Sequence, residues 1–169
     1  MKHSVGIIAV CAGLLLGGCG YQLRGSLEVP ETLKNVYVFG ASSSLQGEME
    51  AMVKASKGKL ATTSKEAGIV IKVLKEDMRI RVLSIGATGK STESELDYYL
   101  KFQFYNNNDQ PLLEEQTIEM AREFFNDQTA VLAKTGEEQL IRNEIYKQAA
   151  RMVMARAKVA IDTVPKNQP

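Results

Sequence analysis

The chain lacks the side chains on which much of enzyme chemistry depends. Its 169 residues include no tryptophan, one histidine (His3) and two cysteines (Cys11 and Cys19). Beyond Cys19 there is no thiol and no imidazole, which excludes an internal disulfide, a Cys/His zinc site and a nucleophile activated by histidine in that part. Carboxylates alone can still support a hydrolase, but we predict that the chain is not an enzyme and uses neither metal nor cofactor.

An excess of charge of one sign is also missing. Lys and Arg number 21 against 20 Asp and Glu, so the net charge of +1 provides no overall field that would steer the chain onto nucleic acid. We therefore expect no nucleic-acid partner. With 44% hydrophobic and 24% charged residues, the composition is that of one globular domain.

The amino-terminal segment is too short to be a membrane span. The basic head Met1–His3 precedes twelve apolar or small residues, 5–16, which as a helix would span about 18 Å, against a hydrocarbon core of about 30 Å. This pattern is typical of an export signal. The tetrad 16–19, Leu-Gly-Gly-Cys, resembles the bacterial lipobox, in which the cysteine is acylated and becomes the first mature residue; the alternative is an ordinary secretory signal with a chance cysteine.

Acylation of Cys19 would tether the chain to a membrane. One acyl chain binds a bilayer only marginally, whereas the three chains of a bacterial lipoprotein hold stably. In lipoproteins that look like this one, Asp after the cysteine usually retains the protein in the inner membrane, and here Gly20 stands there instead. We therefore expect an outer-membrane lipid anchor at Cys19.

Periodicity and turn residues predict six regular elements. In chain order they are a strand at 36–39, a helix at 44–57, an extended stretch at 69–82, strands at 96–104 and 118–124, and a helix at 136–161. The helix limits rest on capping patterns that start at Ser43 and Thr135 and on Gly58 as a C′ residue. In the extended stretch the apolar positions change parity near 75–77, which predicts a bulge.

The order β-α-β-β-β-α predicts an α+β fold. We expect a four-stranded mixed sheet with two helices packed on one face, the first βαβ unit being a candidate parallel crossover. The domain organisation then follows: a signal peptide at 1–18 that is removed, a lipidated lead-in at 19–34, the domain at 35–161 and a flexible tail at 162–169.

Two patterns that suggest catalysis or nucleotide binding have simpler explanations. The run 86–91, Gly-Ala-Thr-Gly-Lys-Ser, has two residues between its glycines where a phosphate loop needs four, and it leads into a strand rather than a helix. Glu114 and Glu115 are adjacent on a strand and so point to opposite faces, while Glu137 and Glu138 suit the start of a helix.

Five basic residues surround the predicted turn at 86–89 and the start of the last helix: Lys75, Arg79, Arg81, Lys90 and Lys134. They are either a solvated sheet edge, since lysine commonly protects such edges, or a rim that binds lipid phosphates. The sequence pattern does not decide between these two interpretations.

Two tyrosines fall on the polar side of the strand predicted at 96–104 and its end. The alternation places Tyr98 with the core residues, whereas Tyr99 and Tyr105 share the other face with charged and amide side chains. Tyrosines on a polar face suit contact with a protein partner, although isolated exposed aromatics are also ordinary.

The mature start and the last third of the chain resemble one known family. The opening 19–25, Cys-Gly-Tyr-Gln-Leu-Arg-Gly, the stretches 124–127 and 130–134, the pair 137–138 and the residues 145–150 are similar to the LptE family of lipoproteins. The predicted element order agrees with that fold, whereas residues 40–90 match in element order only.

The resemblance implies the function of the chain. It implies an outer-membrane lipoprotein that sits in the lumen of an LptD-like β-barrel as a plug, faces the periplasm, helps the barrel to assemble and binds lipopolysaccharide. Lys134 stands at a basic position implicated in that binding, and Lys90 is the nearest candidate for a second contact; we add Arg79 and Arg81 to this expectation. The alternative is a lipoprotein that binds another envelope ligand or acts as a general barrel-assembly factor, without catalysis.

Overall fold

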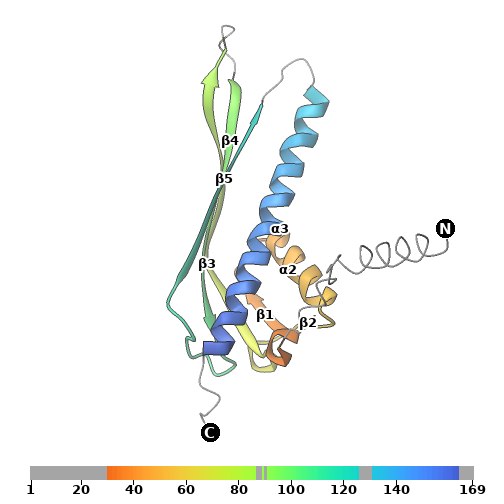
Figure 1. Cartoon of the computed structure of the whole chain (residues 1–169), viewed down its shortest axis with the longest axis vertical. Helices are drawn as coiled ribbons and strands as arrows, with labels where there is room; N and C mark the ends of the chain where they lie inside the picture. The colour runs from red at the N-terminus through yellow and green to blue at the C-terminus, as the bar shows by residue number, and fades with distance from the viewer. Residues whose placement is uncertain (1–29, 87–88, 90, 126–130, 164–169) are drawn as a thin grey trace, which may run out of the picture.

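The structure, a computed structural model, describes residues 30–86, 89, 91–125 and 131–163 (Figure 1). The signal segment, Cys19 and Lys90 lie outside this part, and in the first five residues of the last helix only the backbone is described. The regular elements are η1 (Glu31–Lys34), β1 (Asn35–Phe39), α2 (Ser43–Ala55), β2 (Lys59–Leu60), η2 (Ser64–Glu66), β3 (Ile69–Ile85), β4 (Ser91–Tyr105), β5 (Gln116–Phe125) and α3 (Val131–Thr163).

The strands form one mixed sheet in the order β2-β1-β3-β4-β5. β1 is parallel to β3 and to β2, and the β3–β4 and β4–β5 pairs are antiparallel. The α+β class and the parallel pairing of the first βαβ unit are therefore confirmed, but the prediction of four strands is wrong. The fifth strand, β2, is two residues long, too short to show any periodicity in the sequence.

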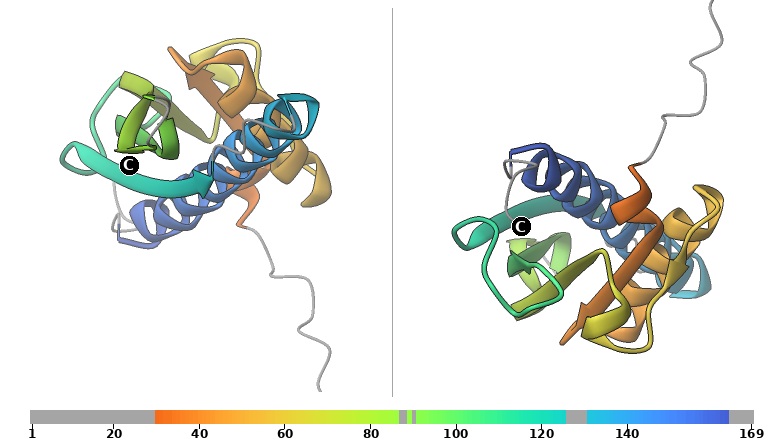
Figure 2. Two further views of the ribbon diagram at one scale, coloured as in Figure 1. Left: turned by 90° about the horizontal axis from the view of Figure 1, so that it is seen from above. Right: turned by 90° about the horizontal axis from the view of Figure 1, so that it is seen from below.

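Both helices lie on the same face of the sheet (Figures 1 and 2). Alternate side chains of β4 supply the sheet side of the core, since Leu96, Tyr98, Leu100, Phe102 and Phe104 are at most 2% exposed. The helix side consists of apolar residues on α2 and α3 in the same cluster: Leu45, Met49, Val53, Ile145, Ala149, Ala150, Val153, Ala157 and Ala160. Four alanines on α3 allow that helix to approach the sheet closely.

A bulge in β3 changes which side chains face the helices. Before it, Ile69, Ile71 and Val73 are buried in the core. The register against β4 then shifts between Val73 and Lys75, so that one residue, Leu74, is added to β3. Beyond the bulge the even-numbered residues 76–82 face the helices, which confirms the parity change seen in the sequence.

The half-buried Glu76, just beyond the bulge, fixes α2 to the sheet. Its carboxylate accepts hydrogen bonds from the Ser42 backbone N–H at 2.7 Å, the Ser42 hydroxyl at 2.7 Å and the Tyr98 hydroxyl at 3.1 Å. Ser42 is the N-cap of α2, and its Oγ also accepts from the Leu45 N–H. A sheet carboxylate is therefore placed at the positive end of the α2 dipole.

The helix limits differ from those expected. α3 begins at Val131 rather than 136, so that the predicted capping pattern lies inside the helix together with Gly136. α2 ends at Ala55, and the left-handed residue that follows is Lys57, with φ 59°, rather than Gly58. Gly58 is required for a different reason, because a Cβ there would lie 2.5 Å from the Lys34 carbonyl oxygen.

The molecule is elongated. The 15 residues of β4 and the 33 residues of α3 each span about 50 Å. We call the end that carries the β3–β4 turn and the start of α3 the distal end, and the end that carries Pro30, β1 and the β4–β5 loop the proximal end (Figure 1).

Candidate functional site

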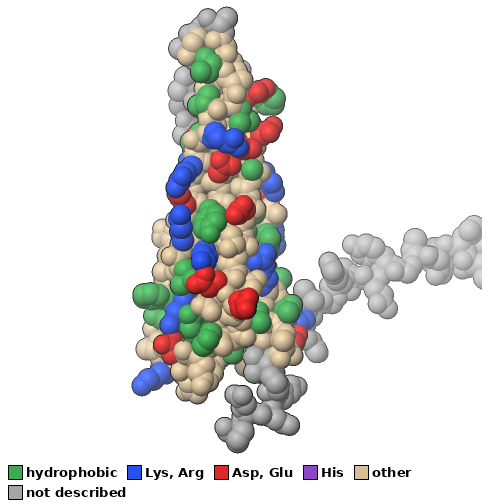
Figure 3. Space-filling view, turned by 90° about the vertical axis from the view of Figure 1, so that its left-hand side faces the viewer, with side chains coloured by type: hydrophobic (Ala, Val, Ile, Leu, Met, Phe, Trp, Pro, Cys, Tyr) green, Lys and Arg blue, Asp and Glu red, His purple; other side chains and the backbone are tan. Residues whose placement is uncertain are grey.

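The face of the sheet that points away from both helices carries most of the predicted site residues that are described. We call it the open face; it presents Lys72, Lys75, Asp77, Arg79, Arg81, Asp97, Tyr99, Lys101, Gln103, Tyr105 and Glu119. Figure 3 shows this side of the molecule, with Lys and Arg side chains along its length and Asp and Glu side chains among them. Alternation along the strands, together with the bulge, brings these residues to one surface.

Arg79 and Arg81 both lie on the open face, and each has acidic neighbours. Arg79 forms an ion pair with Asp77, and Arg81 pairs with Glu95 and, at 3.4 Å, with Asp97. The hydrogen bond that Arg81 donates to the Glu95 carboxylate raises the pKa of Arg81 above its ordinary value. A lipid phosphate would have to compete with these carboxylates, so the two arginines do not form an unoccupied cationic cluster.

Tyr99 lies beside the same charges. It is paired across the strands with Asp77, and the Lys75 Nζ lies 5.3 Å from the centre of its ring. A shallow groove of about 530 Å³ runs past it, lined by residues that include Lys75, Asp77, Arg79, Asp97 and Glu119. The groove offers an aromatic surface and charges of both signs, which suits a polar protein surface better than a single anion.

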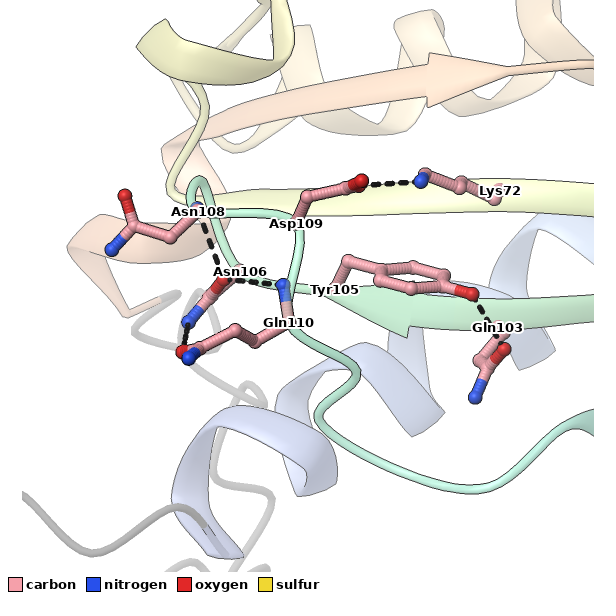
Figure 4. A network of polar contacts seen from close by, with 7 residues as sticks. All are labelled: Lys72, Gln103, Tyr105, Asn106, Asn108, Asp109 and Gln110. Atoms are coloured by element: carbon pink, nitrogen blue, oxygen red, sulfur yellow. Dashed lines mark hydrogen bonds and ion pairs between the residues drawn. The ribbon is translucent and has the colours of Figure 1, made fainter.

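Tyr105 lies in a second group of polar contacts, at the proximal end (Figure 4). The centre of its ring lies 4.1 Å from the Lys72 Nζ, and its hydroxyl donates to Gln103 Oε1 at 2.7 Å. Lys72 also pairs with Asp109 of the β4–β5 loop, and that hydrogen bond raises the pKa of Lys72. Six residues along β4 separate Tyr105 from Tyr99, about 20 Å, so the two tyrosines do not share one pocket.

The β4–β5 loop beside Tyr105 is held by its own side chains. The Asn106 side-chain oxygen accepts from the backbone N–H of Asn108 at 3.0 Å and of Gln110 at 2.9 Å, as Figure 4 shows. An asparagine that bonds the backbone two residues on is the usual way such a turn is fixed. This loop therefore presents the Lys72–Asp109 pair in a defined position.

The residues expected to bind lipopolysaccharide are not all gathered here. Lys134 belongs to the first turns of α3, at the distal end, but its side chain is outside the described part, as is all of Lys90. Arg79 and Arg81 lie on the open face of β3 instead. The roles of these four residues and of Tyr99 and Tyr105 stay predictions.

The acidic partners on the open face were missed by sequence reasoning, because they depend on the exact register of the strands. Counting outward from the predicted turn at 86–89 would pair Arg79 with Leu96 and Arg81 with Ser94, one residue away from the observed pairs Arg79–Asp97 and Arg81–Glu95. The half-exposed apolar residues Ile80 and Val82 were also not anticipated as surface residues, because their alternation resembles that of a buried strand.

Neither a metal site nor a membrane helix is found in the described part of the chain. No three His, Cys, Asp or Glu side chains there gather into a group that could hold a metal ion. None of the described helices combines the length and the apolar character needed to cross a bilayer.

Comparison with known proteins gives a consistent result. The model of the LptE family, described as lipopolysaccharide-assembly, matches residues 33–157. A protein of Photorhabdus laumondii named LPS-assembly lipoprotein LptE is 27% identical over 164 residues, covering 91% of this chain and 85% of its own. A protein of Pectobacterium atrosepticum with the same name is 25% identical over 162 residues, covering 92% and 86%.

Solved structures agree on the fold. Lipoprotein B of Nitrosomonas europaea superposes with a TM-score of 0.64 at 21% identity, covering 85% of this chain and 94% of its own. A minor lipoprotein of Acinetobacter baumannii gives a TM-score of 0.60 at 21% identity, covering 81% and 98%. The family model spans the sheet and both helices, from η1 to the last turns of α3. The chain therefore belongs to the LptE lipopolysaccharide-assembly family.

Proposed function

We propose that the chain is an outer-membrane lipoprotein subunit of the machinery that delivers lipopolysaccharide to the cell surface. In this role it occupies the lumen of an LptD-like β-barrel, helps that barrel to assemble and contacts lipopolysaccharide, with no chemical step of its own. The observation that carries the proposal is the match of the family model over residues 33–157, together with relatives named LPS-assembly lipoprotein LptE.

The dimensions of the fold support a place inside a barrel. β4 and α3 each span about 50 Å, which exceeds the hydrocarbon core of about 30 Å. A barrel wide enough to pass a glycolipid has a lumen that side chains of its own strands cannot fill. An elongated two-layer domain fills such a lumen over the full thickness of the membrane.

The proposed anchor sets an orientation. Eleven residues lead from Cys19 to Pro30, so the acylated cysteine lies at most about 40 Å from the proximal end. The proximal end is then held near the leaflet that carries the lipid chains, and the distal end extends away from that attachment into the barrel.

Lipopolysaccharide contact is assigned to the distal end. Lys134 belongs to the first turns of α3, where the unpaired N–H groups and the positive end of the helix dipole favour a phosphate. Because Arg79 and Arg81 are already paired with carboxylates, we expect them to contribute less than Lys134.

The partner is tested by purification of the full-length lipoprotein from membranes in mild detergent. We expect it to co-purify with one large outer-membrane β-barrel, and we expect Cys19→Ala, which cannot be acylated, to lose membrane attachment. Recovery of the wild-type chain alone, or with several unrelated barrels in equal amounts, would reject the role of a dedicated barrel subunit.

The lipid contact is tested by the variant Lys134→Asp. We expect binding of purified lipopolysaccharide to weaken about tenfold, or about 1.4 kcal/mol, with an unchanged melting temperature. Lys65→Asp is the matched control, because Lys65 is exposed near the proximal end and makes the same charge change. Equal losses in the two variants would show that only net charge matters and would reject a site at Lys134.

A further inference from the structure

The outer part of β3 has one edge without a neighbouring strand. β1 pairs with Ile69–Lys72 only, whereas β3 continues to Ile85 with β4 on its other side. Beyond Lys72, Ser42 at the start of α2 bonds the side chain of Glu76. Among residues 30–86, 89, 91–125 and 131–163, no strand pairs with the edge that remains, which we call the free edge, residues 78–85.

The free edge has the side chains of a strand that is normally paired. Ile80, Val82 and Ile85 are 47%, 52% and 67% exposed, and no proline interrupts the segment. Proteins usually protect such edges, because a long apolar edge with unpaired backbone groups pairs with other chains. The charged side chains of this edge are Arg79 and Arg81, each of which also pairs with an acidic residue of the same sheet.

The other two edges of the sheet, at β2 and β5, are better protected than the free edge of β3. β2 is only two residues long. On β5, arginines bond backbone carbonyls: Arg156 donates to Thr117 O and Arg122 to Ala121 O, both at 2.9 Å. Charged side chains and a short edge strand are the usual means of preventing edge-to-edge pairing. The free edge of β3 therefore stands out as the place where an additional strand can join.

We propose that the free edge binds an extended segment of a β-barrel partner by strand addition, which rests on the proposed function and specifies its assembly step. An incoming strand lies beside Ile80 and Val82 on the helix side and beside Arg79 and Arg81 on the open face. It therefore needs apolar residues alternating with polar or acidic ones. Transmembrane barrel strands have this alternation over about 9–11 residues, and a barrel that has not closed presents unpaired edges.

A second copy of this chain is a poorer occupant. Antiparallel pairing of two free edges about Ile80 would set Arg79 of one copy directly opposite Arg81 of the other. Like charges directly opposite on one face destabilise a strand pair. A partner strand that carries Asp or Glu at those positions avoids this repulsion.

The test is amide hydrogen exchange of the full-length chain with a ten-residue synthetic peptide in which valine alternates with threonine and glutamate. We expect saturable slowing of exchange within residues 78–85. The double variant Ile80→Lys with Val82→Lys should weaken peptide binding at least tenfold. Val159→Lys is the control, because Val159 is 60% exposed on α3 and undergoes the same change away from the edge.

A second peptide separates strand pairing from general apolar contact. It has the same sequence, but every backbone nitrogen is methylated. Neither edge of the peptide can then donate a hydrogen bond. We expect no protection with it. Equal protection by this peptide, protection of β5 instead of β3, or protection of residues 78–85 that grows with protein concentration alone would overturn the proposal.

The result is separable from the test of the proposed function. A barrel that co-purifies with the wild-type chain, combined with no peptide protection, rejects strand addition alone. A chain that purifies without any barrel rejects the proposed function, whatever the peptide does.

Discussion

Replacement of Glu76 tests whether one carboxylate joins the helix layer to the sheet. Glu76→Ala removes the acceptor of three hydrogen bonds, two from Ser42 and one from Tyr98. Tyr98 is only 2% exposed, so its hydroxyl is left without a partner in the core. Hydrogen bonds to charged groups contribute about 1.5–3 kcal/mol each, and a buried donor left without a partner costs about 1–3 kcal/mol. Since the three bonds share one group, we expect a total loss of about 3 kcal/mol.

The assay is urea unfolding followed by circular dichroism, supported by thermal melting. A loss of about 3 kcal/mol lowers the melting temperature by about 10 °C in a domain of this size. Glu76→Gln keeps one acceptor oxygen, so we expect it to lose only about 1 kcal/mol. The control is Glu123→Ala on the exposed side of β5, which should change stability by less than about 0.5 kcal/mol.

A double-mutant cycle with Tyr98→Phe isolates the bond between the two side chains. We expect a coupling free energy of about 1 kcal/mol between Glu76→Ala and Tyr98→Phe, because each single change already removes the same hydrogen bond. Additive effects of the two changes, or a Glu76→Ala protein as stable as the Glu123→Ala control, would refute the reasoning.

Three further predictions concern local chemistry. Burial, helped by a neighbouring carboxylate, raises the pKa of Tyr98, so above pH of about 10 the unfolded chain loses a proton that the folded chain keeps. The free energy of unfolding should then fall by about 1.4 kcal/mol per pH unit from this group, and urea titrations at pH 9–11 should show a shallower fall in Tyr98→Phe but not in Tyr99→Phe. Gly68→Ala should lower the free energy of unfolding by more than about 2 kcal/mol, because its Cβ would lie 2.3 Å from a backbone oxygen of η1. Gly47→Ala in α2 has open space around it and should raise the free energy of unfolding by about 0.5–1 kcal/mol in the same assay. Lys57→Gly should raise the melting temperature by a few degrees, because φ at this residue is 59°; no rise would mean that the left-handed turn is not strained.

The sheet could be predicted well because its strands are regular. Strict alternation around Leu100 is enough to predict β4, and the change of parity after Val73 is enough to predict the bulge in β3. Both signals depend only on which residues are apolar, and the hydrophobic core enforces them.

Helix limits and surface chemistry were predicted less well because they depend on the rest of the fold. Thr135 and Gly136 look like a helix start, but α3 continues four residues before Thr135, and local capping preferences are weak compared with tertiary packing. The positive φ at Lys57 was also not predicted, because Gly58 follows it and glycine is the usual left-handed residue after a helix. The glycine at 58 is required for another reason, its close contact with the Lys34 backbone. The ion pairs of Arg79 and Arg81 required the strand register as well as the residue types.

The extra residue at Leu74 changes which β3 side chains face the helices, so the hairpin beyond it follows a different alternation from the part before it. Another insertion of one residue beyond Leu74 would turn the following β3 side chains to the opposite face, whereas an insertion of two residues would keep each of them on its own side.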